Sequence, residues 1–167
     1  MKSPKTRWLG LFFISLGVSL IIVDATIVNV AVPSIIDDLK ITSSQAQWIQ
    51  ETYTLVFAAL LLVFGRLADV FGRRRMFEIG VSIFVVSSLI AATASSGEFL
   101  ILARLVQGIG GAMMLPTSLS ILNSTFFGRE RGIAFAIWGS TIGGAAALGP
   151  LLGGWLTTDL SWRWAFG

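Results

Sequence analysis

Four charged side chains lie within long, mostly apolar stretches of this sequence. Glu78 is close to the beginning of its stretch, and the other three lie further inside: Asp24, Glu51 and Arg104. A charge surrounded by hydrocarbon is costly, so such residues are usually functional. A carboxyl group can take up and release a proton, whereas arginine keeps its proton and needs a carboxylate, carbonyl oxygens or water beside it. The three residues therefore predict proton exchange linked to a buried ion pair. The alternative is a purely structural pairing between polar groups of neighbouring helices.

Spacing along the chain predicts one common depth for these charges. Counting about 1.5 Å per helical residue from the ends of the apolar stretches places Asp24 and Glu51 roughly 22 Å from the inner membrane boundary, and Arg104 roughly 21 Å. We therefore expect Arg104 to stabilise Asp24, with Glu51 as a third candidate, and protonation of a carboxylate to loosen the pair. For Glu51 an alternative is equally good, in which its side chain reaches the outer interface near Gln47 and Trp48.

Other kinds of chemistry lack the residues that they need. The sequence has no Cys and no His, which excludes disulfides, thiol nucleophiles, histidine catalysis and the common zinc sites. Gly108 and Gly110 are followed by Met113, where a nucleotide-binding loop has its third glycine. We expect no enzyme activity, no metal and no cofactor. The net charge of +3 comes from basic residues in short loops, so we also expect no nucleic-acid binding.

The apolar stretches that must position the charges are long enough to cross a membrane. Of 167 residues, 54% are hydrophobic and 13% charged, whereas a soluble domain has about 25% charged residues. A membrane-spanning helix needs about 20 mostly apolar residues. Five stretches qualify: 8–32, 46–64, 76–94, 99–122 and 133–157. We therefore expect an all-α membrane protein whose residues 1–167 form a single transmembrane domain.

Basic residues predict how these helices are oriented, because Lys and Arg concentrate in cytoplasmic loops. With the N-terminus in the cytoplasm, the inner side holds Lys2, Lys5, Arg7, Arg66, Arg73, Arg74, Arg75, Arg129 and Arg131. Lys40 and Arg163 are then outside. The sequence thus predicts a multi-pass protein of the plasma (inner) membrane with the end of this chain outside. There, the aromatic residues of 162–166 are expected to form an interfacial belt.

The loop between the second and third stretches, Gly-Arg-Leu-Ala-Asp-Val-Phe-Gly-Arg-Arg-Arg at 65–75, has an unusual pattern. Gly65 would let two helices approach closely, and Gly72 would supply the positive φ of a tight reversal. Asp69 can pair with arginines such as Arg73. A basic loop that only sets topology is the alternative, but the interleaved Gly and Asp residues favour a specific turn.

Small residues recur in the fourth and fifth stretches. The glycines of 108–111 and the series Gly139, Gly143 and Ala147 are spaced for close packing of helices. The fifth stretch continues with Leu-Gly-Pro-Leu-Leu-Gly-Gly at 148–154, and Pro150 removes one helical hydrogen bond. Packing alone explains these glycines well. The residues of this last motif are Gly149, Pro150, Gly153 and Gly154, with Gly143 one turn and a half before them.

Taken in order, these motifs resemble those of the major facilitator superfamily, in particular its fourteen-span drug:proton antiporters. The matching segments are the first-span signature at 24–33, the loop gating motif at 65–75, the fourth-span motif at 104–112, whose arginine is linked to proton coupling in the family, and the antiporter motif at 148–154. The segment 162–166 is similar to the sequence before the sixth helix of that branch. The resemblance implies five transmembrane helices of an incomplete N-terminal six-helix bundle.

The resemblance also implies a function. We expect the N-terminal portion of a proton-coupled multidrug efflux transporter, whose partners are the lipid bilayer, protons, a lipophilic small-molecule substrate and the missing C-terminal half. Because such transporters need two pseudo-symmetric halves, five spans alone are not expected to transport. The alternative is a truncated, non-transporting membrane module, or a subunit that needs a partner chain. An import permease fits the motif of the fifth stretch less well.

Overall fold

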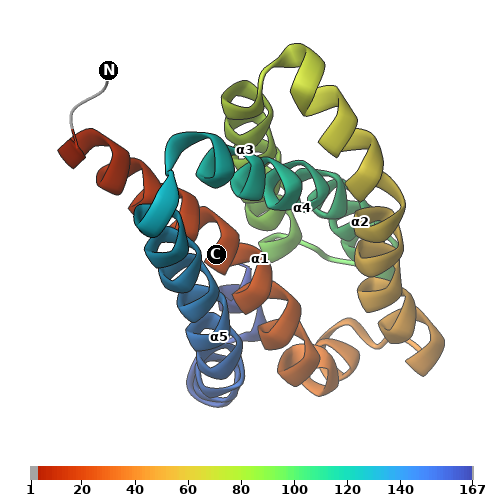
Figure 1. The fold of residues 1–167 in the computed structure, drawn as a ribbon. Helices are drawn as coiled ribbons and strands as arrows, with labels where there is room; N and C mark the ends of the chain where they lie inside the picture. Colours follow the sequence, from red (N-terminus) through yellow and green to blue (C-terminus); the bar gives the residue numbers. More distant parts are fainter. Residues whose placement is uncertain (1–3, 167) are drawn as a thin grey trace.

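The computed structural model describes residues 4–166, which fold into five long helices and one short 3₁₀ helix (Figure 1). Lys2 and Gly167, which the topology prediction used, lie outside the described residues. Over the described part, each long helix is long and apolar enough to cross a membrane. The elements are α1 (Pro4–Leu39), α2 (Ser43–Phe71), α3 (Arg73–Ala92), α4 (Gly97–Thr125), α5 (Gly128–Asp159) and η1 (Trp162–Ala165).

Most helices extend beyond the apolar stretches that predicted them, and at the starts of α2 and α4 polar residues satisfy free backbone groups. Before α2, the Thr42 hydroxyl accepts a hydrogen bond from Gln45 N at 3.2 Å, and the Gln45 side chain accepts one from Thr42 N at 3.0 Å. This reciprocal capping box starts the helix well before its apolar core. Ser96 caps α4 by accepting from Phe99 N at 3.3 Å. Helix α3 is the exception, since it ends at Ala92, two residues before the predicted stretch ends.

Two groups of helices make up the bundle: α1 packs along α5, and α4 packs along both α2 and α3 (Figure 1). Fewer contacts join the groups, and most of them run from α1 to α4 and α2. We call the end of the bundle with residue 4 and the turns at 72 and 126–127 the near end. The turns at 40–42, 93–96 and 160–161 lie at the opposite, far end. Helices α1, α3 and α5 therefore run from the near end to the far end, and α2 and α4 run back.

Glycines allow α4 to approach its neighbours closely, as the sequence predicted. A Cβ added at Gly110 would lie 2.7 Å from the backbone nitrogen of Phe84 on α3. One added at Gly108 would lie 2.8 Å from the carbonyl oxygen of Tyr53 on α2. Neither distance is compatible with a real side chain, so these glycines set the spacing of three helices.

The corresponding prediction for Gly139, Gly143 and Ala147 on α5 is wrong among the described helices. These residues are exposed, and a Cβ added at Gly139 or Gly143 would meet no atom within 4 Å. The face of α5 that packs on α1 carries Gly149 and Gly153 instead. The reason is that several small-residue faces run along this helix, and spacing alone does not choose among them.

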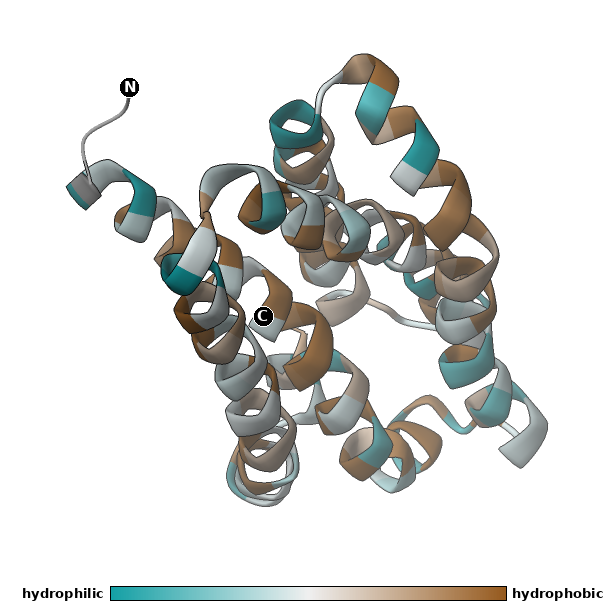
Figure 2. Ribbon diagram, viewed as in Figure 1, coloured by the Kyte–Doolittle hydropathy of each residue, from teal (hydrophilic) through white to brown (hydrophobic). Residues whose placement is uncertain are grey.

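Large apolar side chains cover much of the outer surface of the bundle. Leu62 and Val70 on α2 are 80% and 77% exposed, and Leu151 on α5 is 72% exposed. Figure 2 shows that hydrophilic residues gather near the ends of the helices, whereas apolar residues occupy their middle parts. A surface of this kind is stable in lipid and not in water.

Candidate functional site

The described structure brings Asp24 of α1 and Arg104 of α4 together in the interior of the bundle. The Arg104 Nη1 atom lies 2.6 Å from Asp24 Oδ2, and the two side chains are 1% and 6% exposed, respectively. The sequence predicted this contact from the common depth of the two residues. A buried, charge-assisted hydrogen bond of this length is strong, and removing either partner would leave the other as an uncompensated charge.

Gln107, which was not predicted from the sequence as a site residue, completes the site. Its amide nitrogen donates to Asp24 Oδ1 at 2.9 Å, and its amide oxygen accepts from Arg104 Nη1 at 2.6 Å. Both carboxylate oxygens of Asp24 therefore have a donor. Gln107 is fully buried and lies three residues after Arg104, on the same face of α4. A second polar residue at that spacing in an apolar helix was the available signal.

Helix α2 and the end of the chain supply the remaining contacts of Arg104. Its Nε atom donates to the carbonyl oxygen of Ile49 at 3.4 Å. The guanidinium carbon lies 4.1 Å from the centre of the Tyr53 ring and 5.8 Å from that of Phe166. We define the charge cluster as Asp24, Arg104 and Gln107; the two rings lie beside it.

Glu51 is outside the charge cluster. It is exposed and accepts a hydrogen bond from Gln47 Nε2 at 2.7 Å, as in the alternative interpretation of this residue. The cause is helix rotation: two residues along an α-helix turn a side chain by about 200°. Because Ile49 and Tyr53 face Arg104, Glu51 between them points away.

The loop motif forms the predicted tight reversal at the near end. Gly72, between α2 and α3, has a φ of 97°. Asp69 and Arg73 form an ion pair at 3.1 Å, and Arg73 also donates to the carbonyl oxygen of Ser120 on α4 at 3.3 Å. Gly65 behaves differently from the prediction, since an added Cβ would make only an ordinary contact of 3.8 Å with Pro116.

The antiporter motif of α5 packs against α1 next to the charge cluster. A Cβ added at Gly149 would overlap the side chain of Thr26, and one at Gly153 would lie 3.0 Å from Ile27. Thr26 is two residues from Asp24, so this contact joins α5 to the part of α1 that carries the carboxylate. Helix α5 continues through Pro150, and an added Cβ at Gly154 would meet no atom within 4 Å.

The segment after α5 differs from the predicted interfacial belt. Trp162 and Phe166 are buried, at 3% and 4% exposure, and only Trp164 is exposed. Asp38 at the far end of α1 accepts hydrogen bonds from Trp162 Nε1 at 2.9 Å and from Arg163 Nη1 at 2.6 Å. These bonds hold the segment against the bundle, where the rings of Trp162 and Phe166 join the core.

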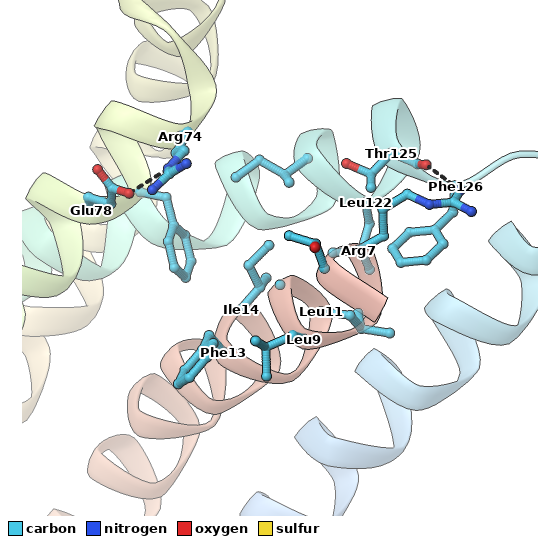
Figure 3. A pocket seen from close by; sticks show the side chains of 14 residues that line it. Arg7, Leu9, Leu11, Phe13, Ile14, Arg74, Glu78, Leu122, Thr125 and Phe126 are labelled. Atoms are coloured by element: carbon cyan, nitrogen blue, oxygen red, sulfur yellow. Dashed lines mark hydrogen bonds and ion pairs between the residues drawn. The ribbon is translucent and has the colours of Figure 1, made fainter. Parts of the chain in front are cut away.

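A cavity of about 470 Å³ lies at the near end between α1, α3 and α4 (Figure 3). Its walls are mainly apolar, and its charged lining residues are already paired. Arg74 forms an ion pair with Glu78 at 2.6 Å, and Arg7 forms one with Glu130 at 3.1 Å. The residues of the charge cluster do not line this cavity. Among the described residues, no group of three or more acidic residues is placed to hold a metal ion.

Comparisons with known proteins agree on one family for this chain. Residues 10–167 match the sequence profile of the Major Facilitator Superfamily. The chain is 44% identical over 159 residues to the puromycin resistance protein pur8 of Streptomyces alboniger, covering 95% of this chain and 32% of that protein. It is 39% identical over 166 residues to the multidrug efflux pump LfrA of Mycolicibacterium smegmatis, covering 99% of this chain and 33% of that protein.

A solved structure has the same fold. The chain superposes with a TM-score of 0.80 on a bacterial homologue of the human lysosomal transporter Spinster in its inward-facing, unoccupied conformation. The sequences are 22% identical, and the match covers 99% of this chain and 40% of that one. The present chain spans about a third of the length of its curated relatives.

Proposed function

Because this chain belongs to the major facilitator superfamily, we propose that it is the N-terminal part of a proton-coupled exporter of lipophilic, drug-like molecules. The observation that carries the proposal is the buried ion pair between Asp24 and Arg104. Burying charges within a membrane protein costs free energy, so residues of this kind are usually functional. The relatives named for puromycin resistance and multidrug efflux support export as the direction of transport.

In the proposed cycle, Asp24 is the group that carries the proton. It takes a proton from water on one side of the membrane, becomes neutral, and loses its ion pair with Arg104. It later releases the proton to water on the other side, and the ion pair forms again. Arg104 keeps its own proton throughout. The geometry suits this exchange because, among the described residues, Asp24 has hydrogen bonds to two side chains, both on α4.

Breaking the ion pair between Asp24 and Arg104 would affect the packing of other helices. Asp24 connects α1 with α4, and Thr26 packs against Gly149 of α5. A change in the pairing of Asp24 would therefore alter how α1 sits between α4 and α5. In the complete transporter, this bundle would move against a second half, with the substrate between them. We place the near end in the cytoplasm and the far end outside, in the plasma membrane, following the distribution of Lys and Arg.

The decisive experiment replaces Asp24 by Asn in the complete transporter that contains this segment. We expect D24N to abolish drug efflux driven by a pH gradient in everted membrane vesicles, because asparagine cannot carry a proton. The matched control is D37N, the same change at an exposed residue further along α1. D37N should transport like the wild type. Wild-type efflux by D24N under the same gradient would remove Asp24 from the mechanism.

A further inference from the structure

The Arg104 side chain contacts several groups besides the carboxylate of Asp24. Among these partners, only Asp24 is negatively charged. The others include the amide oxygen of Gln107, the carbonyl oxygen of Ile49, and the ring of Tyr53, whose centre lies 4.1 Å from the guanidinium carbon. The ring belongs to α2, whereas the ion pair joins α1 and α4. Arg104 is therefore held from three helices, and the contact from α2 includes an aromatic face.

This aromatic contact matters most when Asp24 is neutral. A buried arginine without a counter-charge is strongly destabilising. In the proposed transport cycle, that situation arises each time Asp24 carries a proton, because Arg104 remains charged. The electron-rich face of an aromatic ring attracts a cation, and the attraction is largest where water is excluded. Arg104 is 1% exposed, so the Tyr53 ring acts on a desolvated charge.

The hydroxyl group of Tyr53 takes no part in this contact. Tyr53 is 5% exposed, and its buried hydroxyl has no hydrogen-bond partner among the described residues. An unpaired buried hydroxyl costs free energy rather than contributing it. The useful part of this residue at the site is therefore its ring.

We propose that Tyr53 is a positioning residue, whose ring holds the Arg104 guanidinium in place while Asp24 is protonated. The proposal rests on the proton-coupled function above. It adds to that function the group that stabilises the charge of Arg104 while Asp24 is protonated. The centre of the Phe166 ring lies 5.8 Å from the same guanidinium carbon, which is near the limit of cation–π contacts. Phe166 therefore stabilises the charge of Arg104 less than Tyr53 does.

No other described charge competes with this assignment. On α2, Glu51 is exposed and bonded to Gln47. At η1, Arg163 is paired with Asp38 at 2.6 Å. The titratable groups in contact with the Arg104 guanidinium are thus Asp24 and the phenol of Tyr53 itself. A change in pH dependence on replacing Tyr53 therefore reports on the ring and the carboxylate.

The first test measures the pH profile of transport by the complete protein in liposomes, with Y53L and Y53F as the matched pair. Y53L keeps an apolar side chain and removes the ring, so protonation of Asp24 leaves a less stabilised cation. We expect the midpoint of drug transport to move to lower pH by on the order of one unit, which is a tenfold change in proton concentration. Y53F keeps the ring and should retain the wild-type midpoint.

The second test does not depend on transport. Because asparagine imitates the neutral carboxyl group, Y53L should lower the melting temperature of the purified protein more in the D24N background than in the wild type. F84L provides the control, since Phe84 is a buried ring on α3 without a contact to Arg104. Its effect should be equal in both backgrounds.

The two tests separate the proposal from the function on which it rests. A wild-type protein that shows no pH-driven transport would overturn the proposed function, and the melting temperatures would still decide the role of Tyr53. Equal effects of Y53L in both backgrounds, or an unchanged midpoint, would overturn the role of the ring. A Y53F midpoint that matches Y53L would also overturn it, because the hydroxyl would then be the group that acts.

Discussion

At the scale of single residues, the charge cluster is a closed triangle of hydrogen bonds. Asp24 is bound by Arg104 and Gln107, and these two are bound to each other at 2.6 Å. In such a network each member orients the next, so the loss of one side chain affects both of the others. Gln107 is neutral, and it can keep its bond to Arg104 whether or not Asp24 is charged.

Gln107 gives the prediction that belongs to this scale. Q107L removes the donor to Asp24 Oδ1 and leaves that buried oxygen without a partner, which costs about 1–3 kcal/mol. We expect a lower melting temperature of the detergent-purified transporter. N29L is the control, because the exposed Asn29 amide bonds only to its own helix, at Ala25 O. A melting temperature equal to that of the wild type would mean that water replaces Gln107.

The sequence was sufficient to predict the central contact but not its surroundings. Asp24 and Arg104 could be paired because residue counting along a helix gives depth with an error of about one turn. Rotation about the helix axis is not available from such counting. Glu51 was predicted at the depth of Arg104, but it lies on the face of α2 that points away from Arg104. Tyr53, two residues later, lies on the face toward Arg104. Gln107 could have been found from its spacing to Arg104.

At the scale of helices, one face of α5 determines how closely it lies to α1. Gly149 and Gly153 are buried against Thr26 and Ile27, whereas Gly139 and Gly143 are exposed. The packing of α1 on α5 depends on the absence of side chains at two positions. Since Asp24 lies on the same part of α1, this packing also positions the carboxylate.

A pair of identical substitutions tests this. G149A places a methyl group onto Thr26, and overpacking of this kind costs about 1–3 kcal/mol. G143A adds the same methyl group where no atom lies within 4 Å, and alanine favours the helix. We expect G149A to lower the melting temperature of the complete transporter in detergent and G143A to leave it unchanged or raise it. The reverse order would show that α1 and α5 pack differently.

The helices themselves were readily predicted, but their ends and partners were not. Long apolar stretches identify a membrane helix because lipid leaves few other solutions for the backbone. The ends depend on single polar residues: the capping box of Thr42 and Gln45 extends α2 beyond its apolar core. The burial of Trp162 depends on its bond to Asp38, which is 124 residues away in the sequence. Local patterns contain no information about such a partner.

At the scale of the whole molecule, the two ends of the bundle differ in charge. The near end holds the arginines of the turn after α2 and Arg7, which pairs with Glu130. The far end holds two described basic residues, Lys40 and Arg163, beside the acidic Asp37, Asp38, Glu98 and Asp159. The fold class and the count of long helices followed from composition and length. The grouping of α1 with α5 did not, because it depends on contacts between helices far apart in the sequence.

The orientation of the molecule can be measured directly, since this chain has no cysteine of its own. We expect a cysteine at Lys40 to react with a membrane-impermeant maleimide on intact cells. A cysteine at Arg129 should react only after the membrane is opened, because basic loops remain in the cytoplasm. The two variants are made in the complete transporter after any cysteine outside this segment has been replaced, and they serve as controls for each other. Labelling of Arg129→Cys on intact cells would reverse the proposed orientation.

The pairing of α1 with α5 has a consequence for biosynthesis. Among these five helices, α1 is made first, and its main neighbour α5 is made last, after three others. Until α4 is inserted, Asp24 has neither of the donors that bind it in the finished bundle. The early intermediate therefore holds a lone carboxyl group in the membrane or at its insertion machinery. Translation of about 80 further residues, the separation of Asp24 and Arg104, is needed before that group meets its arginine.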